Sequence, residues 1–251
     1  MAVVWQKRVA GKHYEVRKAG QSTRLYTDGV FHSQYNPNRP IARGVWDLLM
    51  LPAFFISPQT IKRVLVLGAG GGAVIHLLNR YVKPDEIVAV ELDAVHISIA
   101  KRFFGIKKSM ATLVKAEAVE WLKVYRGPPF DMIIDDLFVE GEGDGVRAVP
   151  LSAMWFNLLS RRLSKKGVLV CNVFSLQELR NSAYYTDARV GAKFRSVFSL
   201  RLPAYENVVA AFLKGDSSAR VLRHTISNID GLNALSGPDR LDMQIKNIAV
   251  D

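Results

Sequence analysis

The stretch Val64-Leu-Val-Leu-Gly-Ala-Gly-Gly-Gly-Ala73 decides the fold of this chain. Its first four residues are an apolar run of valines and leucines, which predicts a buried parallel strand. The run stops at glycines and continues into residues 74–82, where apolar residues recur with helical spacing. A strand, a glycine turn and a helix in this order are typical of the first unit of a nucleotide-binding α/β domain.

A second apolar run, Val88-Ala-Val-Glu-Leu-Asp93, follows that helix and ends in acids. The glycines of the turn allow the backbone to approach a ligand where a Cβ atom would collide. Glu91 lies where a carboxylate accepts hydrogen bonds from ribose hydroxyls, and Asp93 follows it. The predicted nucleoside-binding glycines are Gly68, Gly70, Gly71 and Gly72. These features predict a nucleoside site and leave the nucleoside open.

The chain divides into three predicted parts. Residues 1–55 combine short alternating runs, the hairpin signal Asp28-Gly29 and a helical apolar stripe over 41–55, which predicts an antiparallel β-module with a connecting helix. Residues 56–215 alternate strands and helices, which predicts an α/β domain with a doubly wound, mostly parallel sheet of seven strands. Two runs at its end, 194–202 and 207–213, are too close for a helical crossover and predict an antiparallel pair at the sheet edge. Residues 216–251 form a polar C-terminal tail.

Composition restricts the partners that we expect. The chain has 251 residues, 49% of them hydrophobic, enough for one large core. Its net charge is +11, but the basic residues are spread over predicted helix ends and turns, so we expect a solvated surface and no nucleic-acid partner. We expect a cytoplasmic protein without a membrane partner, because no apolar stretch is long enough to span a bilayer. The five histidines have no metal-ligand spacing, so no metal is expected.

The glycine turn by itself also fits a dinucleotide-binding fingerprint, with Ala73 in the third glycine position, so NAD remains an alternative. Other features favour a sulfonium nucleoside. The fourth core strand, Phe130-Asp-Met-Ile-Ile-Asp-Asp136, carries carboxylates, and the fifth is followed by the antiparallel pair. This order of elements resembles the class I S-adenosylmethionine-dependent transferases. The resemblance implies S-adenosylmethionine, or its decarboxylated form, as co-substrate.

A narrower resemblance covers about residues 10–215. The leading hairpin Arg24-Leu-Tyr-Thr-Asp-Gly29, the helix after it and the strand ending at Asp136 look like the spermidine synthase family. The resemblance implies that Glu91 holds the ribose, that Glu117 and Ala118 lie beside the adenine, and that Asp136 takes the place of the catalytic aspartate. It also implies a homodimer that transfers an aminopropyl or methyl group to a small amine.

The sequence departs from that family where the substrates bind. The family usually has an aspartate at Gly71, paired with the donor's amine; its loss favours the carboxylated donor and methyl transfer, whereas the family frame favours aminopropyl transfer. His32 replaces a glutamine beside the acceptor site, and residues 40–43 lack the family's Tyr-His-Glu stretch. We therefore expect slow or absent synthesis of spermidine from putrescine. A non-catalytic nucleoside-binding protein of the same fold remains an alternative.

The chemistry of the acceptor site depends on acids at the end of the fourth core strand. A carboxylate there would take the proton of an attacking amine. Asp136 is favoured by the resemblance, although Asp135 is equal by chemistry and Asp136 also suits a loop cap. The acids of the following glycine-rich loop would either bind a cationic acceptor as a lid or form a solvated turn. The predicted acceptor-binding residues are His32, Glu140, Glu142 and Asp144.

Overall fold

The computed structural model describes residues 1–139, 146–233 and 242–249. Its N-terminal part is an antiparallel sheet in the order β1-β2-β3-β4. The strands are β1 (Ala2–Val9), β2 (Lys12–Ala19), β3 (Ser22–Thr27) and β4 (Val30–Tyr35). Asp28 and Gly29 link β3 to β4 with φ of +48° and +83°, the left-handed backbone that a two-residue hairpin turn requires. The predicted β-module is confirmed.

The main sheet has the order β14-β12-β13-β11-β8-β5-β6-β7. Its strands are β5 (Arg63–Leu67), β6 (Glu86–Glu91), β7 (Thr112–Lys115), β8 (Phe130–Asp135), β11 (Leu163–Val173), β12 (Ser196–Arg201), β13 (Val208–Leu213) and β14 (Gln244–Asn247). The strands from β7 to β11 are parallel, and β13 pairs antiparallel with both β11 and β12. The predicted mostly parallel sheet is therefore confirmed.

The C-terminal tail adds structure that the sequence did not predict. The antiparallel pair β12–β13 is confirmed, but its place at the sheet edge is wrong, because β14 pairs antiparallel with β12. The described part of the sheet thus has eight strands instead of seven. The helix α9 (Ala219–Ser227) buries Leu222 and Ile226 against the core. The strand β14 pairs with backbone groups of β12 that an edge strand would leave unpaired.

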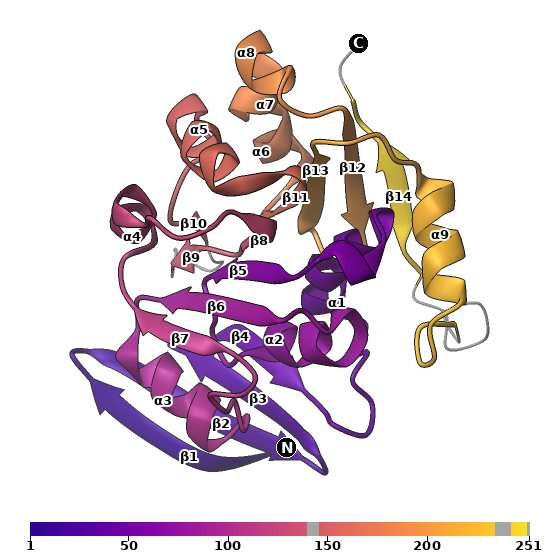
Figure 1. The fold of residues 1–251 in the computed structure, drawn as a ribbon. Coiled ribbons are helices and arrows are strands. Elements are labelled where there is room, and N and C mark those ends of the chain that lie inside the picture. The colour runs from indigo at the N-terminus through magenta and orange to yellow at the C-terminus, as the bar shows by residue number, and fades with distance from the viewer. Residues whose placement is uncertain (140–145, 234–241, 250–251) are drawn as a thin grey trace.

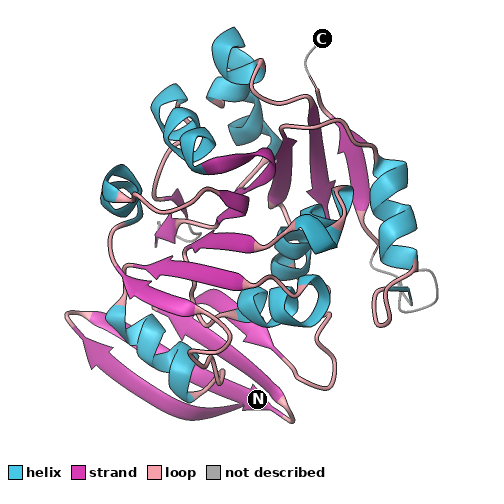
Figure 2. Cartoon of the chain, viewed as in Figure 1, coloured by secondary structure: helices cyan, strands magenta, loops and turns pink. Residues whose placement is uncertain are grey.

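Helices cover both faces of the sheet (Figure 2). The stripe over 41–55 forms α1 (Val45–Met50) and then a 3-10 helix (Leu51–Phe55) with Pro52 in its first turn. The helix after the glycine turn is α2 (Ala73–Leu77), which passes into a π-helix (Leu78–Val82). The remaining helices are η2 (Pro58–Thr60), α3 (Ala94–Arg102), α4 (Ala118–Val124), α5 (Ala153–Arg162), α6 (Leu176–Arg180), α7 (Ala183–Thr186) and α8 (Ala188–Gly191).

Alternate residues of β5 belong to different cores. Val64 and Val66 pack with the β-module, α1, α2, α3 and α9, whereas Leu65 and Leu67 pack with α4 and α5. Because side chains alternate along a strand, this division explains why β5 is apolar throughout. The β-module lies beside β7 and α3, and α9 with β14 lies far from it (Figure 1). The carboxyl ends of the core strands, where α/β sheets bind ligands, meet near the β3–β4 hairpin.

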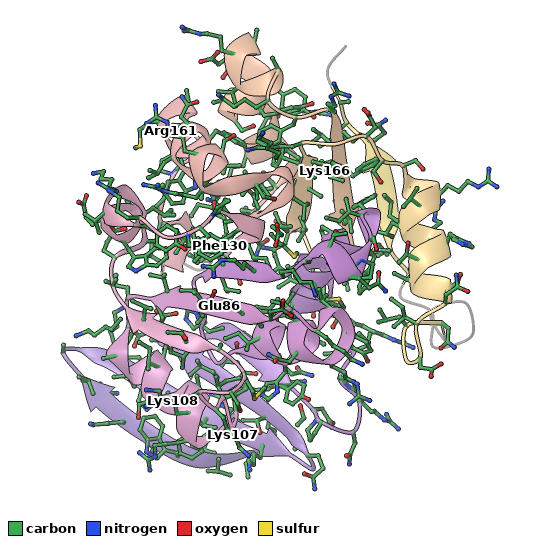
Figure 3. The ribbon with its side chains drawn as sticks, in the orientation of Figure 1. Glu86, Lys107, Lys108, Phe130, Arg161 and Lys166 are labelled. Carbon is green, nitrogen blue, oxygen red and sulfur yellow. The ribbon has the colours of Figure 1, made fainter. Side chains whose placement is uncertain are left out.

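Basic side chains are distributed over separate parts of the surface. Figure 3 shows Lys107 and Lys108 near α3, far from Arg161 on α5 and from Lys166. Nearer the sheet, Arg63 forms an ion pair with Glu86. In the part of the chain that the structure describes, no helix has both the length and the apolar character needed to cross a membrane.

Candidate functional site

A cavity of about 730 Å³ lies at the carboxyl ends of β5, β6, β8 and β11. The glycine turn after β5 and the ends of β6 and β8 form its floor. The β3–β4 hairpin, α1 and the connection between β12 and β13 contribute further walls. A volume of this size suits a small-molecule ligand of the size of a nucleoside with a second substrate.

Only part of the glycine turn lines the cavity. Gly68 and Gly70 line the cavity, and a Cβ atom on Gly68 would collide with the backbone oxygen of Asp136. Gly71 faces the protein: a Cβ atom there would lie 2.7 Å from Phe104 Cζ and 2.8 Å from Ser33 Cβ. The Gly71 N–H donates to Ser33 Oγ at 2.9 Å.

Gly72 also faces the protein, because its Cβ atom would lie 2.7 Å from Ile106 Cγ1. Of the four predicted nucleoside-binding glycines, the structure thus places Gly68 and Gly70 at the cavity. It places Gly71 and Gly72 against packed side chains, where the lack of a side chain permits close packing.

Glu91 joins the end of β6 to the glycine turn. Its Oε2 accepts hydrogen bonds from the N–H groups of Ala69 at 3.0 Å and Gly70 at 2.9 Å, and its Oε1 accepts from Asp93 N–H at 2.9 Å. Burial raises the pKa of Glu91 despite these hydrogen bonds. The same carboxylate therefore lines the cavity and holds the turn that surrounds it.

Asp93 links the cavity to the β-module. Its Oδ1 accepts from Val95 N–H at 2.7 Å, which caps α3, and its Oδ2 accepts from the Tyr14 hydroxyl at 2.7 Å. Burial opposes ionisation of Asp93, but the Tyr14 hydrogen bond and the nearby His96 outweigh it and lower the pKa of Asp93. Asp93 is thus a charged anchor that holds β2 against α3.

Glu117 and Ala118 line the cavity beyond the end of β7. The Glu117 carboxylate caps α4 by accepting from the N–H groups of Val119 at 3.0 Å and Glu120 at 2.8 Å. The structure therefore brings both residues to the same cavity as Glu91, on the side away from β11.

The neighbouring acids Asp135 and Asp136 have different surroundings. Asp135 is fully buried, and its Oδ2 accepts from Arg147 Nη2 at 2.6 Å and Trp155 Nε1 at 2.8 Å. Asp136 lines the cavity, and its Oδ1 accepts from Asn172 Nδ2 at 2.8 Å. Burial, together with the charge of Asp135, raises the pKa of Asp136 to about 6. Asp136 is therefore the acid that a bound substrate can reach.

Two asparagines and an arginine that sequence reasoning missed hold Asp136 in place. Asn207 Nδ2 donates to Asn172 Oδ1 at 3.2 Å, and Arg147 Nη1 donates to the Asn172 backbone oxygen at 2.5 Å. Asn172 had a usable signal in the sequence, because it is a polar residue near the carboxyl end of an apolar core strand. Arg147 had none, since its contacts to Asp135 and Asn172 join it to strands that lie elsewhere in the sequence.

Two histidines lie at the cavity beneath the hairpin. His32 comes from β4, and its ring centroid is 5.0 Å from that of His96 on α3. His96 is buried, its Nε2 is 2.8 Å from Thr27 Oγ1, and its Nδ1 is 3.9 Å from Glu91 Oε1. Within the described ranges, no group of three or more His, Cys, Asp and Glu side chains is placed to hold a metal ion.

The predicted acidic residues Glu140, Glu142 and Asp144 lie outside the described residues. The segments on either side of them, β9 (Phe138–Val139) and β10 (Val146–Arg147), pair antiparallel next to the cavity.

Comparisons with known proteins agree with this architecture. The family described as "Spermine/spermidine synthase domain" matches residues 47–224. Similar curated proteins include polyamine aminopropyltransferase 2 of Caldanaerobacter subterraneus, 24% identical over 171 residues, 66% of this chain and 55% of that protein. The polyamine aminopropyltransferase of Vibrio vulnificus is 30% identical over 153 residues, 60% of this chain and 48% of that protein. The chain thus spans about half the length of these relatives.

The fold also has solved counterparts. A probable spermidine synthase from Corynebacterium glutamicum superposes with a TM-score of 0.72 at 17% identity, over 98% of this chain and 91% of that one. Spermidine synthase from Thermotoga maritima superposes with a TM-score of 0.67 at 15% identity, over 91% of this chain and 78% of that one. At such low identity these structures establish the shared fold.

Proposed function

Because the chain belongs to the spermine/spermidine synthase family, we propose that it transfers an alkyl group from a sulfonium nucleoside to a small amine. The main support is the position of Asp136 in the cavity. The strands β5, β6 and β7, which carry the predicted nucleoside-binding residues, lie on one side of Asp136, and β11 and β13 lie on the other. An acid in that position lies beside the point where the two bound substrates would meet, and can take a proton from the attacking amine.

The proposed reaction uses Asp136 as the proton acceptor. The amine nitrogen attacks the carbon attached to the sulfonium, the carbon–sulfur bond breaks, and its electron pair stays on the sulfur of the leaving thioether. The proton lost by the amine passes to the Asp136 carboxylate. Proton acceptance by a positioned carboxylate typically contributes about 10²–10⁴-fold to a rate. Asn172 fixes the orientation of that carboxylate through its 2.8 Å hydrogen bond.

We propose decarboxylated S-adenosylmethionine as the donor, and hence aminopropyl transfer. The curated relatives are named polyamine aminopropyltransferases. Packing accounts for the glycine at position 71, because Phe104 and Ser33 occupy the space that a side chain there would need. Glu91 would bind the ribose, with Glu117 and Ala118 beside the adenine. The family match supports this nucleoside over NAD.

The oligomeric state belongs to the same proposal. The strand β1 lies at the outer edge of the β-module, with Met1, Val3 and Val4 about half exposed. A small β-module that leaves an edge and apolar side chains open gains stability from a partner surface. We propose a homodimer; light scattering that gave the mass of one chain, 28.0 kDa, across micromolar concentrations would contradict it.

The function is tested by product analysis. The protein is incubated with a mixture of amines and either decarboxylated S-adenosylmethionine or S-adenosylmethionine, and the products are identified by mass spectrometry. Aminopropyl transfer predicts methylthioadenosine and an aminopropylated amine in equal amounts. S-adenosylhomocysteine with a methylated amine would instead assign methyl transfer. Binding of a donor without any product would favour the non-catalytic alternative and overturn the proposal.

A further inference from the structure

We propose that Asp47 is a positioning residue for the second substrate, because its buried carboxylate fixes the start of α1 and thereby the indole of Trp46 in the cavity wall. The inference rests on the proposed function for the identity of that substrate as an amine. It goes beyond the proposed function by assigning a role to a buried acid next to the cavity wall.

The Asp47 carboxylate binds the backbone that precedes its own helix. Asp47 is 1% exposed and lies in the first turn of α1. Its Oδ2 accepts from Gly44 N–H at 2.9 Å, and its Oδ1 accepts from Ala42 N–H at 3.4 Å. Burial raises the pKa of Asp47 to about 6, and these N–H groups oppose the rise. The carboxylate is therefore charged at neutral pH, and its hydrogen bonds are charge-assisted.

The turn before α1 has a conformation that needs such support. Arg43 has φ of +57°, in the left-handed region that residues with a side chain rarely adopt. A residue in this region persists where its surroundings fix it, and such positions are frequent at functional sites. Asp47 binds the residues on both sides of Arg43 and so fixes the turn.

The residues that follow this turn form part of the cavity wall. Val45 and Trp46 line the cavity, and the Trp46 ring lies edge-on to Phe31 at a centroid distance of 5.0 Å. A Cβ atom on Gly44 would lie 3.3 Å from Trp46 Cε3 and 3.7 Å from the Tyr205 hydroxyl. The backbone of the turn is thus in close contact with the indole, and a shift of the turn would move it.

Trp46 belongs to the side of the cavity away from the predicted nucleoside-binding acids. Tyr205 lies in the connection between β12 and β13, and α1 approaches both β11 and β13. Glu91 and Glu117 follow β6 and β7, on the other side of Asp136. An indole can contact both the ammonium group and the methylene groups of an amine. A displaced indole should therefore weaken amine binding and leave nucleoside binding intact.

The first test asks whether Asp47 holds Trp46, and it needs no substrate. Acrylamide quenching of tryptophan fluorescence is measured for wild type and Asp47→Asn, each corrected with the same protein carrying Trp46→Phe. Asparagine keeps the shape of aspartate but loses the charge, and its NH₂ group faces backbone donors. We expect stronger quenching of Trp46 in Asp47→Asn, and unchanged quenching would overturn the inference. Ser218→Ala, which removes the N-cap hydrogen bond of α9, is the control for a general loss of stability.

The second test separates the two substrates by calorimetry. Methylthioadenosine is titrated first, and butylamine is then titrated into the saturated protein. For Asp47→Asn we expect butylamine affinity to fall about tenfold, the lower end for a charge-assisted contact, with methylthioadenosine affinity within about threefold of wild type. An equal loss of both ligands, an unchanged butylamine affinity or a wild type that binds no butylamine would overturn the inference. Product analysis is separate, so a protein that shows the expected differences but forms no product would refute only the proposed function.

A double-mutant cycle tests whether Asp47 acts through Trp46. Trp46→Ala removes the indole, so adding Asp47→Asn to that variant should lower butylamine affinity by less than about twofold. A purely structural role of Asp47 would give the same loss with and without the indole, and that result would overturn the inference.

Discussion

At the scale of single residues, Asp135 and Asp136 carry the same side chain but have different surroundings, because they occupy successive positions at the end of one strand. Successive strand residues point to opposite sides, so Asp135 enters the core and meets Arg147, whereas Asp136 reaches the cavity. Sequence reasoning placed the reactive acid at the end of this strand but separated the two only by a family resemblance. Arg147, the partner of Asp135, and Asn172, the partner of Asp136, come from other strands. Contacts between strands cannot be read from the pattern of residues along the chain.

The hydrogen bond from Asn172 should control the ionisation of Asp136. It favours the charged carboxylate and therefore lowers a pKa that burial raises, with a result of about 6. The value of kcat/KM, which reports ionisation in the free enzyme, should rise with pH through about 6, because only the ionised acid accepts a proton. In Asn172→Ala this rise should move to higher pH by about one unit. Asn207→Ala, which removes a contact to Asn172 and none to Asp136, is the control; identical profiles for all three proteins would contradict this role.

The raised pKa of Asp136 should also reduce stability at neutral pH. The folded-state pKa of about 6 exceeds the ordinary value of 3.8, so the folded protein binds the proton more tightly than the unfolded chain. Its stability should therefore fall as pH rises from about 4 to about 6. Asp136→Asn should be more stable than wild type at pH 7, by up to about 3 kcal/mol, and lose this advantage below pH 4. Chemical denaturation at both pH values measures this, and a variant less stable at pH 7 would refute it.

At the scale of elements, the glycine turn was predicted with all four of its glycines binding the nucleoside, whereas the structure places two of them, Gly68 and Gly70, at the cavity. Its neighbours are Ser33 on β4 and Phe104 just beyond α3, both distant in sequence. The spacing of the glycines indicates that other atoms lie close to the backbone of the turn. It does not indicate whether those atoms belong to a ligand or to the protein. The atoms close to Gly71 belong to the side chains of Phe104 and Ser33. The atoms close to Gly68 belong to the backbone of Asp136.

Restoring the family's aspartate at Gly71 should fail. Its Cβ atom would lie under 3 Å from Phe104 and Ser33, and such overpacking typically costs about 1–3 kcal/mol. We expect Gly71→Asp to lower the unfolding free energy by that amount without tightening decarboxylated S-adenosylmethionine. Gly215→Asp is the control, because a Cβ atom there meets nothing within 4 Å. Tighter donor binding in Gly71→Asp would show that the aspartate reaches the cavity.

At the scale of the whole molecule, the doubly wound core was predictable because short continuous apolar runs alternate with segments of helical spacing between residues 63 and 213. The tail was not. β14 has only four residues, Gln-Ile-Lys-Asn, which carry too little apolar signal for a strand. Its pairing depends on the open edge of β12, which is a property of the assembled sheet.

Removing residues 242–251 should therefore destabilise the protein. The deletion takes away β14 and exposes the edge of β12, with a loss of about 2–4 kcal/mol if a few ladder hydrogen bonds contribute about 0.5–1.5 kcal/mol each. An exposed edge strand also promotes association. Thermal unfolding with light scattering measures both effects, and deletion of residues 250–251 alone serves as the control. Unchanged unfolding after the longer deletion would mean that β14 adds nothing to the sheet.

We propose above all that Asp136 receives a proton during alkyl transfer from a sulfonium nucleoside to an amine. The most direct measurement compares wild type and Asp136→Asn in a single turnover of decarboxylated S-adenosylmethionine with a saturating amine, alongside calorimetry of donor binding. Proton acceptance by Asp136 predicts a rate lower by about 10²–10⁴-fold in the variant, with donor affinity within about threefold of wild type. Equal rates, or a loss of rate that is fully matched by a loss of donor binding, would contradict it.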